Sequence, residues 1–256
     1  MSEPTIACNL EGQVALVTGA TSGLGRRFAN LIADCGAKVA LAGRRVDRLE
    51  EVAKEIEARG GVAVPLPLDM TDDQAVKAAP ARAEELLGAP VQILINNAGI
   101  PDAQRAHKMD LELINAVFDT NLRGPWILAC EVGRRLIEEK LPGRIVNISS
   151  VGAYNYAGIG AALYSVTKSA IIRMTEVLAV EWSRNHINVT GIAPGSFRSE
   201  MMDGMLERMG DLSQGFPRKR IGEPEQLDST LLYLLSPASE MVTGTVVIVD
   251  DGQMSR

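Results

Sequence analysis

The sequence of 256 residues predicts a single α/β domain, with a seven-stranded parallel sheet and helices on both of its faces. Three observations indicate this fold. Short runs rich in Val, Ile and Leu recur along the chain, stretches with helical spacing of apolar residues separate them, and no Pro-, Gly- or Ser-rich linker divides the chain. Alternating strands and helices require right-handed crossovers, which leave the strands parallel.

The predicted strands are short apolar runs at residues 14–17, 38–42, 62–66, 91–95, 144–148, 187–192 and 245–249. The predicted helices have apolar residues three and four positions apart, at residues 26–35, 48–59, 72–87, 126–139, 162–183 and 224–235. Hydrophobic residues make up 46% of the chain and aromatic residues only 4%. We therefore expect a core of aliphatic side chains, which buried parallel strands prefer.

Composition excludes several classes of function. The formal net charge of −6 disfavours a nucleic-acid-binding or anionic-membrane surface, because such a surface needs a basic stripe. Cys8, Cys35 and Cys130 are odd in number and lack Cys-x-x-Cys spacing, so neither a disulfide framework nor a zinc site is expected. The two histidines are isolated, and we expect no metal site. Without an apolar leader or a long apolar run, the sequence predicts a soluble cytoplasmic protein.

Tyr164 and Lys168 stand four residues apart in a predicted helix, in the sequence Tyr-Ser-Val-Thr-Lys. This spacing is about one helical turn, so both side chains project from the same face. A free phenol has a pKa of about 10, and a nearby ammonium group favours the phenolate. We therefore expect Lys168 to lower the pKa of Tyr164 so that the tyrosine can shuttle a proton. The alternative is a buried aromatic residue beside an ordinary surface lysine.

A glycine-rich turn follows the first predicted strand and precedes the first predicted helix, with the sequence Thr-Gly-Ala-Thr-Ser-Gly-Leu-Gly at residues 18–25. Gly19 would permit a tight turn, Gly23 would let the backbone approach a pyrophosphate, and Gly25 would let the helix pack on the strand. The predicted phosphate-binding residues are Gly19, Thr21, Ser22, Gly23, Leu24 and Gly25. The spacing differs from the commoner Gly-x-Gly-x-x-Gly pattern, so a plain tight loop is the alternative.

Four further polar motifs follow in order. They are Asn96-Asn97-Ala98-Gly99, Asn121 in Thr-Asn-Leu-Arg-Gly, Ser149-Ser150, and Pro194-Gly195. With the glycine turn and Tyr-x-x-x-Lys, they make residues 13–252 resemble the short-chain dehydrogenase/reductase family in its single-domain form. The resemblance implies a Rossmann-like doubly wound sheet, hydride transfer between a nicotinamide cofactor and a small-molecule ketone or secondary alcohol, and a homotetramer.

The resemblance also implies the catalytic roles. Tyr164 would be the acid/base, Ser150 would hydrogen-bond the substrate oxygen, Lys168 would hold the nicotinamide ribose, and Asn121 would support a proton path through water. Ser150 is favoured over Ser149 because its spacing to Tyr164 is closer to that of the family, although one residue longer. The extra residue lies in the loop at residues 151–163, whose tyrosines at positions 154 and 156 are expected to shape the pocket.

The end of the second predicted strand bears on the choice of cofactor. A carboxylate there would accept hydrogen bonds from the adenosine ribose and repel a 2′-phosphate. This chain has Gly43 followed by Arg44 and Arg45, and arginine donors fit phosphate oxygens. We therefore expect NADP(H). The alternative is that the two arginines begin a solvated helix face, with Asp47 and Glu50 as their partners.

The resemblance assigns the remaining cofactor contacts by position. They are Asp69, Met70, Asn97, Ala98, Gly99, Tyr164, Lys168, Pro194, Gly195 and Ser199. Three of these residues have purely structural alternatives. Asp69 could be a turn acceptor for Thr71, Gly99 could have a structural role only, and Ser199 could be a helix N-cap.

Residues 199–220 break the alternation of strands and helices. Met201, Met205 and Met209 recur at every fourth position, and the segment follows Pro-Gly, where the family places its substrate lid. Because methionine adapts its shape, we expect an apolar lid, although a helix face packed on the core is the alternative. Near the C-terminus, Asp251 departs from the family pattern Val-Asp-Gly-Gly.

Two other functions remain open. An NAD-dependent dehydrogenase of the same family would differ only in its cofactor. A non-catalytic redox sensor that binds the nucleotide would not need Ser150, Tyr164 and Lys168 together, so their joint presence favours an enzyme. The framework alone does not select a substrate.

Overall fold

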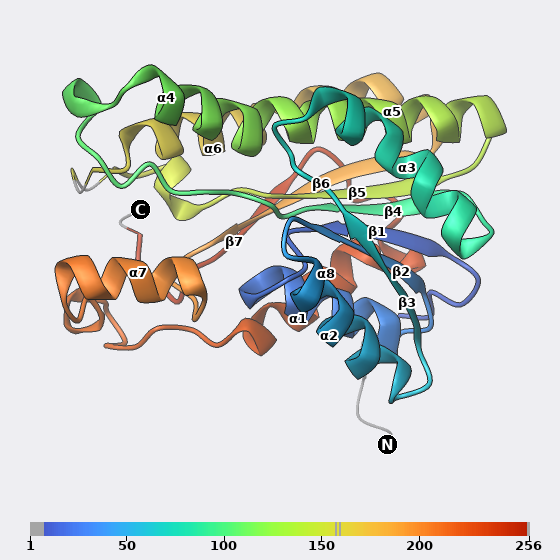
Figure 1. Ribbon diagram of the computed structural model, residues 1–256, viewed down its shortest axis with the longest axis horizontal. Helices are drawn as coiled ribbons and strands as arrows, with labels where there is room; N and C mark the ends of the chain where they lie inside the picture. Colours follow the sequence, from blue (N-terminus) through green and yellow to red (C-terminus); the bar gives the residue numbers. More distant parts are fainter. Residues whose placement is uncertain (1–7, 157, 159, 255–256) are drawn as a thin grey trace.

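A parallel sheet forms the centre of the structure, a computed structural model that describes residues 8–156, 158 and 160–254 (Figure 1). Its strands are β1 (Val14–Thr18), β2 (Lys38–Gly43), β3 (Val62–Pro67), β4 (Val91–Asn96), β5 (Gly143–Ile148), β6 (Ile187–Pro194) and β7 (Val246–Val249). The described strands pair in the order β3-β2-β1-β4-β5-β6-β7, and every pair is parallel. The predicted doubly wound sheet is confirmed.

Helices cover both faces of this sheet. They are α1 (Gly23–Asp34), α2 (Val46–Glu57), α3 (Asp73–Leu87), α4 (Leu111–Phe118), α5 (Gly124–Glu139), α6 (Ala162–Trp182), α7 (Glu200–Met209) and α8 (Asp228–Leu235). The buried residues of α1, α2 and α8 pack on one face, and those of α3, α5 and α6 pack on the other (Figure 1). Helix α7 lies apart from both layers, within the segment where we expected a lid.

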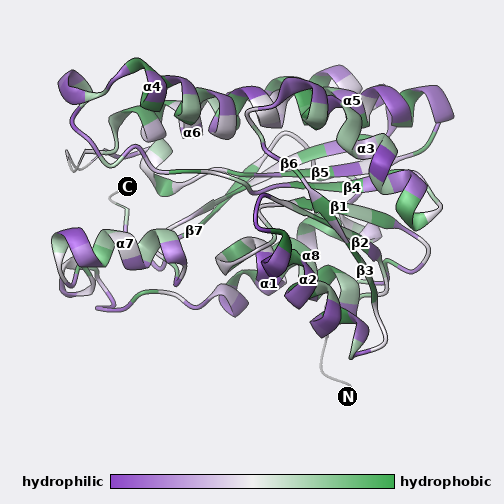
Figure 2. Ribbon diagram, in the orientation of Figure 1, coloured by the Kyte–Doolittle hydropathy of each residue, from purple (hydrophilic) through white to green (hydrophobic). Residues whose placement is uncertain are grey.

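Strand β1 shows how the sequence supplies both cores. All five of its residues are buried. Ala15 and Val17 join the cluster beneath α1, α2 and α8, whereas Val14 and Leu16 join the cluster beneath α3, α5 and α6. Successive side chains of a strand point to opposite faces, so a continuous apolar run contributes side chains to the hydrophobic core on each face of the sheet. Figure 2 shows hydrophobic colours along much of the sheet and mixed colours on the helices around it.

The order of the strands places a ligand site beside β1. The chain runs from β1 outward through β2 to β3 and then returns to β4 on the other side of β1. The loops after β1 and β4 therefore run in opposite directions and leave a crevice at the carboxyl ends of the two strands. Open parallel sheets bind ligands in a crevice of this kind, where the strand order reverses. Among the described residues, no helix combines the length and apolar composition needed to cross a bilayer.

Candidate active site

A cavity of about 830 Å³ opens at the carboxyl ends of the strands. Its walls come from the glycine turn, from the ends of β2, β4, β5 and β6, and from α6 and α7. Of the residues predicted to bind cofactor or to take part in catalysis, Gly25 and Asn121 do not line it, and the rest do. The motifs that lie far apart along the chain are therefore brought together around one cavity.

The backbone of the glycine turn follows a tight path that requires glycine. Gly19 and Gly23 have φ angles of +67° and +51°, in the left-handed region that favours glycine. A Cβ atom on Gly25 would lie 2.2 Å from the carbonyl oxygen of Gly19. The Asn97 amide donates hydrogen bonds to the carbonyl oxygens of Thr18 and Gly19, at 3.0 and 3.3 Å. This turn, at the N-terminus of α1, has the geometry of an anion cradle and fits a cofactor pyrophosphate.

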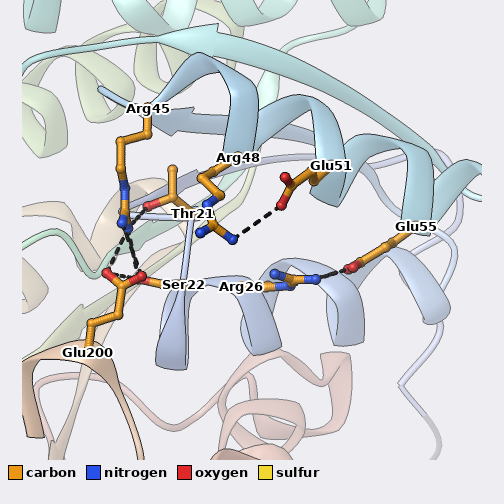
Figure 3. Close-up of polar contacts among 8 residues, drawn as sticks. All are labelled: Thr21, Ser22, Arg26, Arg45, Arg48, Glu51, Glu55 and Glu200. Atoms are coloured by element: carbon orange, nitrogen blue, oxygen red, sulfur yellow. Dashed lines mark hydrogen bonds and ion pairs between the residues drawn. The ribbon is translucent and has the colours of Figure 1, made fainter. Parts of the chain in front are cut away.

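The two arginines after β2 differ in their contacts. Arg45 donates hydrogen bonds to the hydroxyl oxygens of Thr21 and Ser22 at 2.7 and 3.1 Å, and it forms an ion pair with Glu200 at 2.9 Å (Figure 3). The Ser22 hydroxyl donates to the same carboxylate at 3.0 Å. Arg44 is exposed at the cavity wall and forms no ion pair with any described residue. Arg44 is therefore the arginine whose charge is available to a ligand.

The Arg45–Glu200 pair joins the glycine turn to the start of α7. The hydrogen bond from Arg45 lowers the pKa of the Glu200 carboxyl group, so this group is ionised at neutral pH. The two side chains are 44% and 55% exposed, and ion pairs at such positions contribute only about 0–1 kcal/mol. The sequence analysis missed Glu200, because its partner lies 155 residues away and no local motif marks it.

Helix α7 begins at Ser199, which also contacts the glycine turn. The Ser199 hydroxyl accepts the backbone N–H of Met202 at 3.2 Å, as the N-cap alternative predicts. A Cβ atom on Gly23 would lie 3.0 Å from the Cβ atom of Ser199, so turn and helix are in close contact. Met201 and Met205 line the cavity, but Met209 is 42% exposed and does not. The methionine stripe therefore faces the cavity only along its first two positions.

Asp69 and the loop after β5 also line the cavity in part. The Asp69 carboxylate accepts hydrogen bonds from the backbone and hydroxyl of Thr71, so it is both a turn acceptor and a wall residue. Tyr156 lines the cavity, whereas Tyr154 does not and is 46% exposed. Residues 157 and 159 of the predicted insertion loop lie outside the described residues. Asp251, which differs from the family pattern Val-Asp-Gly-Gly, forms ion pairs with two arginines of the segment after α7, at positions 218 and 220.

Asn121 lies in a π-helical turn, Asp119–Arg123, between α4 and α5. It is 1% exposed, and its amide both accepts the N–H of Ile100 at 2.8 Å and donates to the Ile100 carbonyl at 2.9 Å. It also donates to the Thr167 hydroxyl at 3.4 Å. The wider π turn is a common device at functional sites. Here it directs Asn121 into the protein, where it holds the loop after β4 against α6.

The two adjacent serines point in different directions. The Ser149 side chain is buried, and its hydroxyl donates to the Lys168 carbonyl oxygen at 2.8 Å. Ser150 is half-buried, and its hydroxyl oxygen accepts the Gly152 N–H at 3.1 Å and hydrogen-bonds Tyr164. Successive residues of an extended chain face opposite sides, which explains the difference. Of the two serine hydroxyls, only that of Ser150 contacts the Tyr164 phenol.

Lys168 and Tyr164 share a helix face, as their spacing predicts. The Lys168 ammonium lies 5.6 Å from the centre of the Tyr164 ring and donates to the Ile148 carbonyl oxygen at 2.7 Å. Burial lowers the pKa of Lys168 to about 8. Burial also raises the pKa of Tyr164, outweighing the hydrogen bond from Ser150. The pKa of Tyr164 in the protein by itself is therefore raised rather than lowered, because desolvation of the phenol dominates, and the effect of Lys168 on it stays a prediction.

A second carboxylate, Asp102, was also missed by the sequence analysis. It is 2% exposed and lies in the loop after β4, beside the first turn of α6. No group of three or more His, Cys, Asp or Glu side chains suited to holding a metal ion occurs in the described part of the chain. The described charged residues that line the cavity are four cations, Arg44, Arg45, Lys168 and Arg208, and two carboxylates, Asp69 and Glu200, whereas Asp102 lies behind the wall.

Comparison with known proteins extends over almost the whole chain. A family model described as short chain dehydrogenase matches residues 13–209. Gluconate 5-dehydrogenase of Gluconobacter oxydans is 36% identical over 255 residues, with 98% of each chain covered. A short-chain type dehydrogenase/reductase from Mycobacterium marinum has a TM-score of 0.93 at 31% identity, covering 98% of this chain and 100% of its own. A short chain dehydrogenase from Burkholderia cenocepacia, in complex with NADP, has a TM-score of 0.88 at 30% identity, covering 96% and 99%.

Proposed function

Because the chain belongs to the short-chain dehydrogenase/reductase family, we propose that it is an NADP(H)-dependent oxidoreductase acting on a ketone or secondary alcohol. One observation carries the proposal. Ser150, Tyr164 and Lys168 line the same cavity as the glycine turn, so a reacting group and a bound dinucleotide would share one enclosure. The cofactor would supply or accept the hydride, and the residues of the chain would position the reactants and move one proton.

Tyr164 is the proposed acid/base. Its raised pKa keeps the phenol protonated at neutral pH, which suits proton donation to a substrate oxygen in the direction of reduction. Ser150 is the proposed donor to the same oxygen, where charge develops as the carbonyl is reduced. Lys168 would hold the nicotinamide ribose, and Asn121 would support proton transfer to solvent through water and Lys168. Oxidation requires the phenolate and is therefore expected to gain rate as the pH rises.

The preference for NADP(H) rests on the end of β2. Gly43 stands where a carboxylate would repel the 2′-phosphate, and Arg44 is free to pair with it. Arg45 is a weaker candidate because Glu200 already neutralises it. The complex of the Burkholderia cenocepacia relative with NADP supports the same assignment. Preference for NAD(H) is the competing outcome.

The proposed substrate is a small molecule bound beside α7, and residues 199–220 are its proposed lid. Methionines of α7 and Phe216 supply apolar walls there, whereas the Gluconobacter oxydans relative is named for a polar sugar acid. We also propose a homo-oligomer. Trp126 on α5, together with Val166 and Val180 on α6, exposes apolar surface that a second copy would cover.

A substrate panel tests the function directly. Gluconate, other polyols and bulky apolar ketones would be assayed with NADPH and NADH, by following the absorbance of the reduced nicotinamide, with Tyr164→Phe as the inactive control. We expect turnover with NADPH for at least one substrate class. Nucleotide binding without turnover of any member, in either direction, would favour the redox-sensor alternative.

A further inference from the structure

A buried carboxylate lies at the beginning of the helix that carries Tyr164. Asp102 is 2% exposed, and its Oδ2 atom accepts the backbone N–H groups of Leu163 and Tyr164 at 2.8 and 3.2 Å. Its Oδ1 atom accepts the N–H of Ala103 at 3.0 Å. Among the described residues it forms no ion pair. The charge of Asp102 is therefore balanced by backbone N–H groups and by the positive end of the α6 dipole.

Helix α6 begins without a capping side chain at its N-cap position. Ala161 is the N-cap residue, and the first turn of the helix contains no acidic residue. The first N–H groups of a helix need acceptors from outside the helix. Asp102 supplies one from 61 residues earlier in the chain, and an isolated parallel bridge between Gln104 and Ala161 lies beside it. The position of the first turn of α6 therefore depends on the loop after β4.

The same loop is held by Asn121. The Asn121 amide exchanges two hydrogen bonds with the backbone of Ile100, two residues before Asp102. Thr167, which Asn121 also contacts, donates its hydroxyl to the Tyr164 carbonyl oxygen at 2.8 Å. The backbone of Tyr164 is thus held at its N–H by Asp102 and at its carbonyl by Thr167. These contacts fix where the phenol can lie relative to Ser150.

Asp102 differs from the other holding residues because it is charged. A negative charge close to a phenol opposes formation of the phenolate, and Asp102 raises the pKa of Tyr164 in this way. The other groups facing Tyr164 are the Lys168 cation on the same helix and the neutral Ser150 hydroxyl after β5. The carboxylate thus favours the proton-donating form of the tyrosine.

We propose that Asp102 is a positioning residue of the reaction proposed above, one that orients Tyr164 and favours its protonated form. The proposal rests on the proposed function for its kinetic consequences but not for its structural ones. Asp102→Asn removes the charge while keeping an oxygen that can accept the N–H groups of α6. Asp102→Ala removes both charge and acceptor. Asp110→Asn is the matched control, because Asp110 caps α4 in the same manner at an exposed position.

Rates measured against pH separate orientation from charge. In Asp102→Asn we expect the pKa of Tyr164 to fall. The pH at which the rate of reduction decreases, and the pH at which the rate of oxidation increases, should then both be lower than in the wild type. In Asp102→Ala we expect kcat to fall about tenfold or more with little change in KM, because a small displacement of a catalytic group is costly. Asp110→Asn should match the wild type in both respects. An unchanged pH profile in Asp102→Asn overturns the proposal, as does an Asp102→Ala protein that loses only thermal stability.

A titration without substrate separates this proposal from the proposed function. The ultraviolet difference absorbance of phenolate would be followed against pH in wild type and in Asp102→Asn. Subtracting the Tyr164→Phe protein isolates one of the four tyrosines. Ionisation of Tyr164 at lower pH in Asp102→Asn supports the proposal even if no substrate is turned over, and identical titrations overturn it. This titration also tests the effect of the Asp102 charge on Tyr164 if the Asp102→Ala protein does not fold.

Discussion

The two ends of the cavity hold their charged side chains in different surroundings. Beside the glycine turn, Arg45 and Glu200 form an ion pair at the cavity wall, with about half of each side chain exposed, at 44% and 55%. At the Tyr164 end, Asp102 and Lys168 are only 2% and 4% exposed, and backbone groups bond both. A phosphate can replace an exposed partner at little cost, whereas an unsatisfied buried group costs about 1–3 kcal/mol. We therefore expect ligand binding to rearrange the first end and to leave the second in place.

The largest effect is expected from the buried end. Tyr164→Phe removes the transferable proton but leaves a ring that packs in the same space. We expect kcat to fall by about 10²- to 10⁴-fold, the range of general acid/base catalysis, while cofactor affinity stays the same. Steady-state kinetics and fluorescence titration with NADPH measure the two quantities. A variant that keeps more than about half of the wild-type kcat on a slow substrate contradicts the assignment.

The adjacent serines sharpen the contrast within that end. Ser150→Ala should lower kcat by about 10²-fold, because one donor to a developing oxyanion contributes roughly 3 kcal/mol. Ser149→Ala breaks the buried hydrogen bond to the Lys168 carbonyl, so it should lower the free energy of unfolding by about 1 kcal/mol and alter kcat far less. Kinetics combined with urea unfolding tests both. The reverse order of kinetic effects would mean that Ser149 faces the substrate.

At the exposed end, the two arginines should contribute unequally. Arg44→Asp removes the unpaired cation and adds a carboxylate, so the ratio of kcat/KM for NADPH over NADH should fall about tenfold or more. Arg45→Ala should lower the ratio less, because Glu200 already occupies that guanidinium. The double change Arg44→Asp with Arg45→Ala should act most strongly. A wild-type ratio near one, or a larger effect from Arg45→Ala than from Arg44→Asp, contradicts this interpretation.

The smallest effect is expected from the partner of Arg45. Glu200→Gln frees the guanidinium, so the NADPH preference should rise by about two- to fivefold, the equivalent of one exposed ion pair. Asp203→Asn removes the same charge from the first turn of α7 and serves as the control. Dissociation constants for both nucleotides at low and high salt measure the effect. If the two variants behave alike, the change reflects net charge rather than the Arg45–Glu200 contact.

The strands and the polar motifs after them were readable from the sequence. Each predicted strand lies within two residues of an observed one, because buried parallel strands need continuous apolar runs. Helix α4 was not predicted, and its length explains why. It has only eight residues, and a short apolar run does not by itself distinguish a helix from a strand. The single predicted helix at residues 224–235 is a 3-10 turn, Pro224–Leu227, followed by α8.

The sequence by itself determined which residues meet, because parallel strands bring all their carboxyl ends to one edge and carry the motifs with them. Only the tertiary structure decided how those residues are charged and held. The spacing of Tyr164 and Lys168 predicted a lowered pKa, but burial raises the pKa of Tyr164. Asp102 and Glu200 reach the site across 61 and 155 residues of chain. Desolvation and long-range contacts depend on what the whole fold packs around a group, and no local pattern of residues records that.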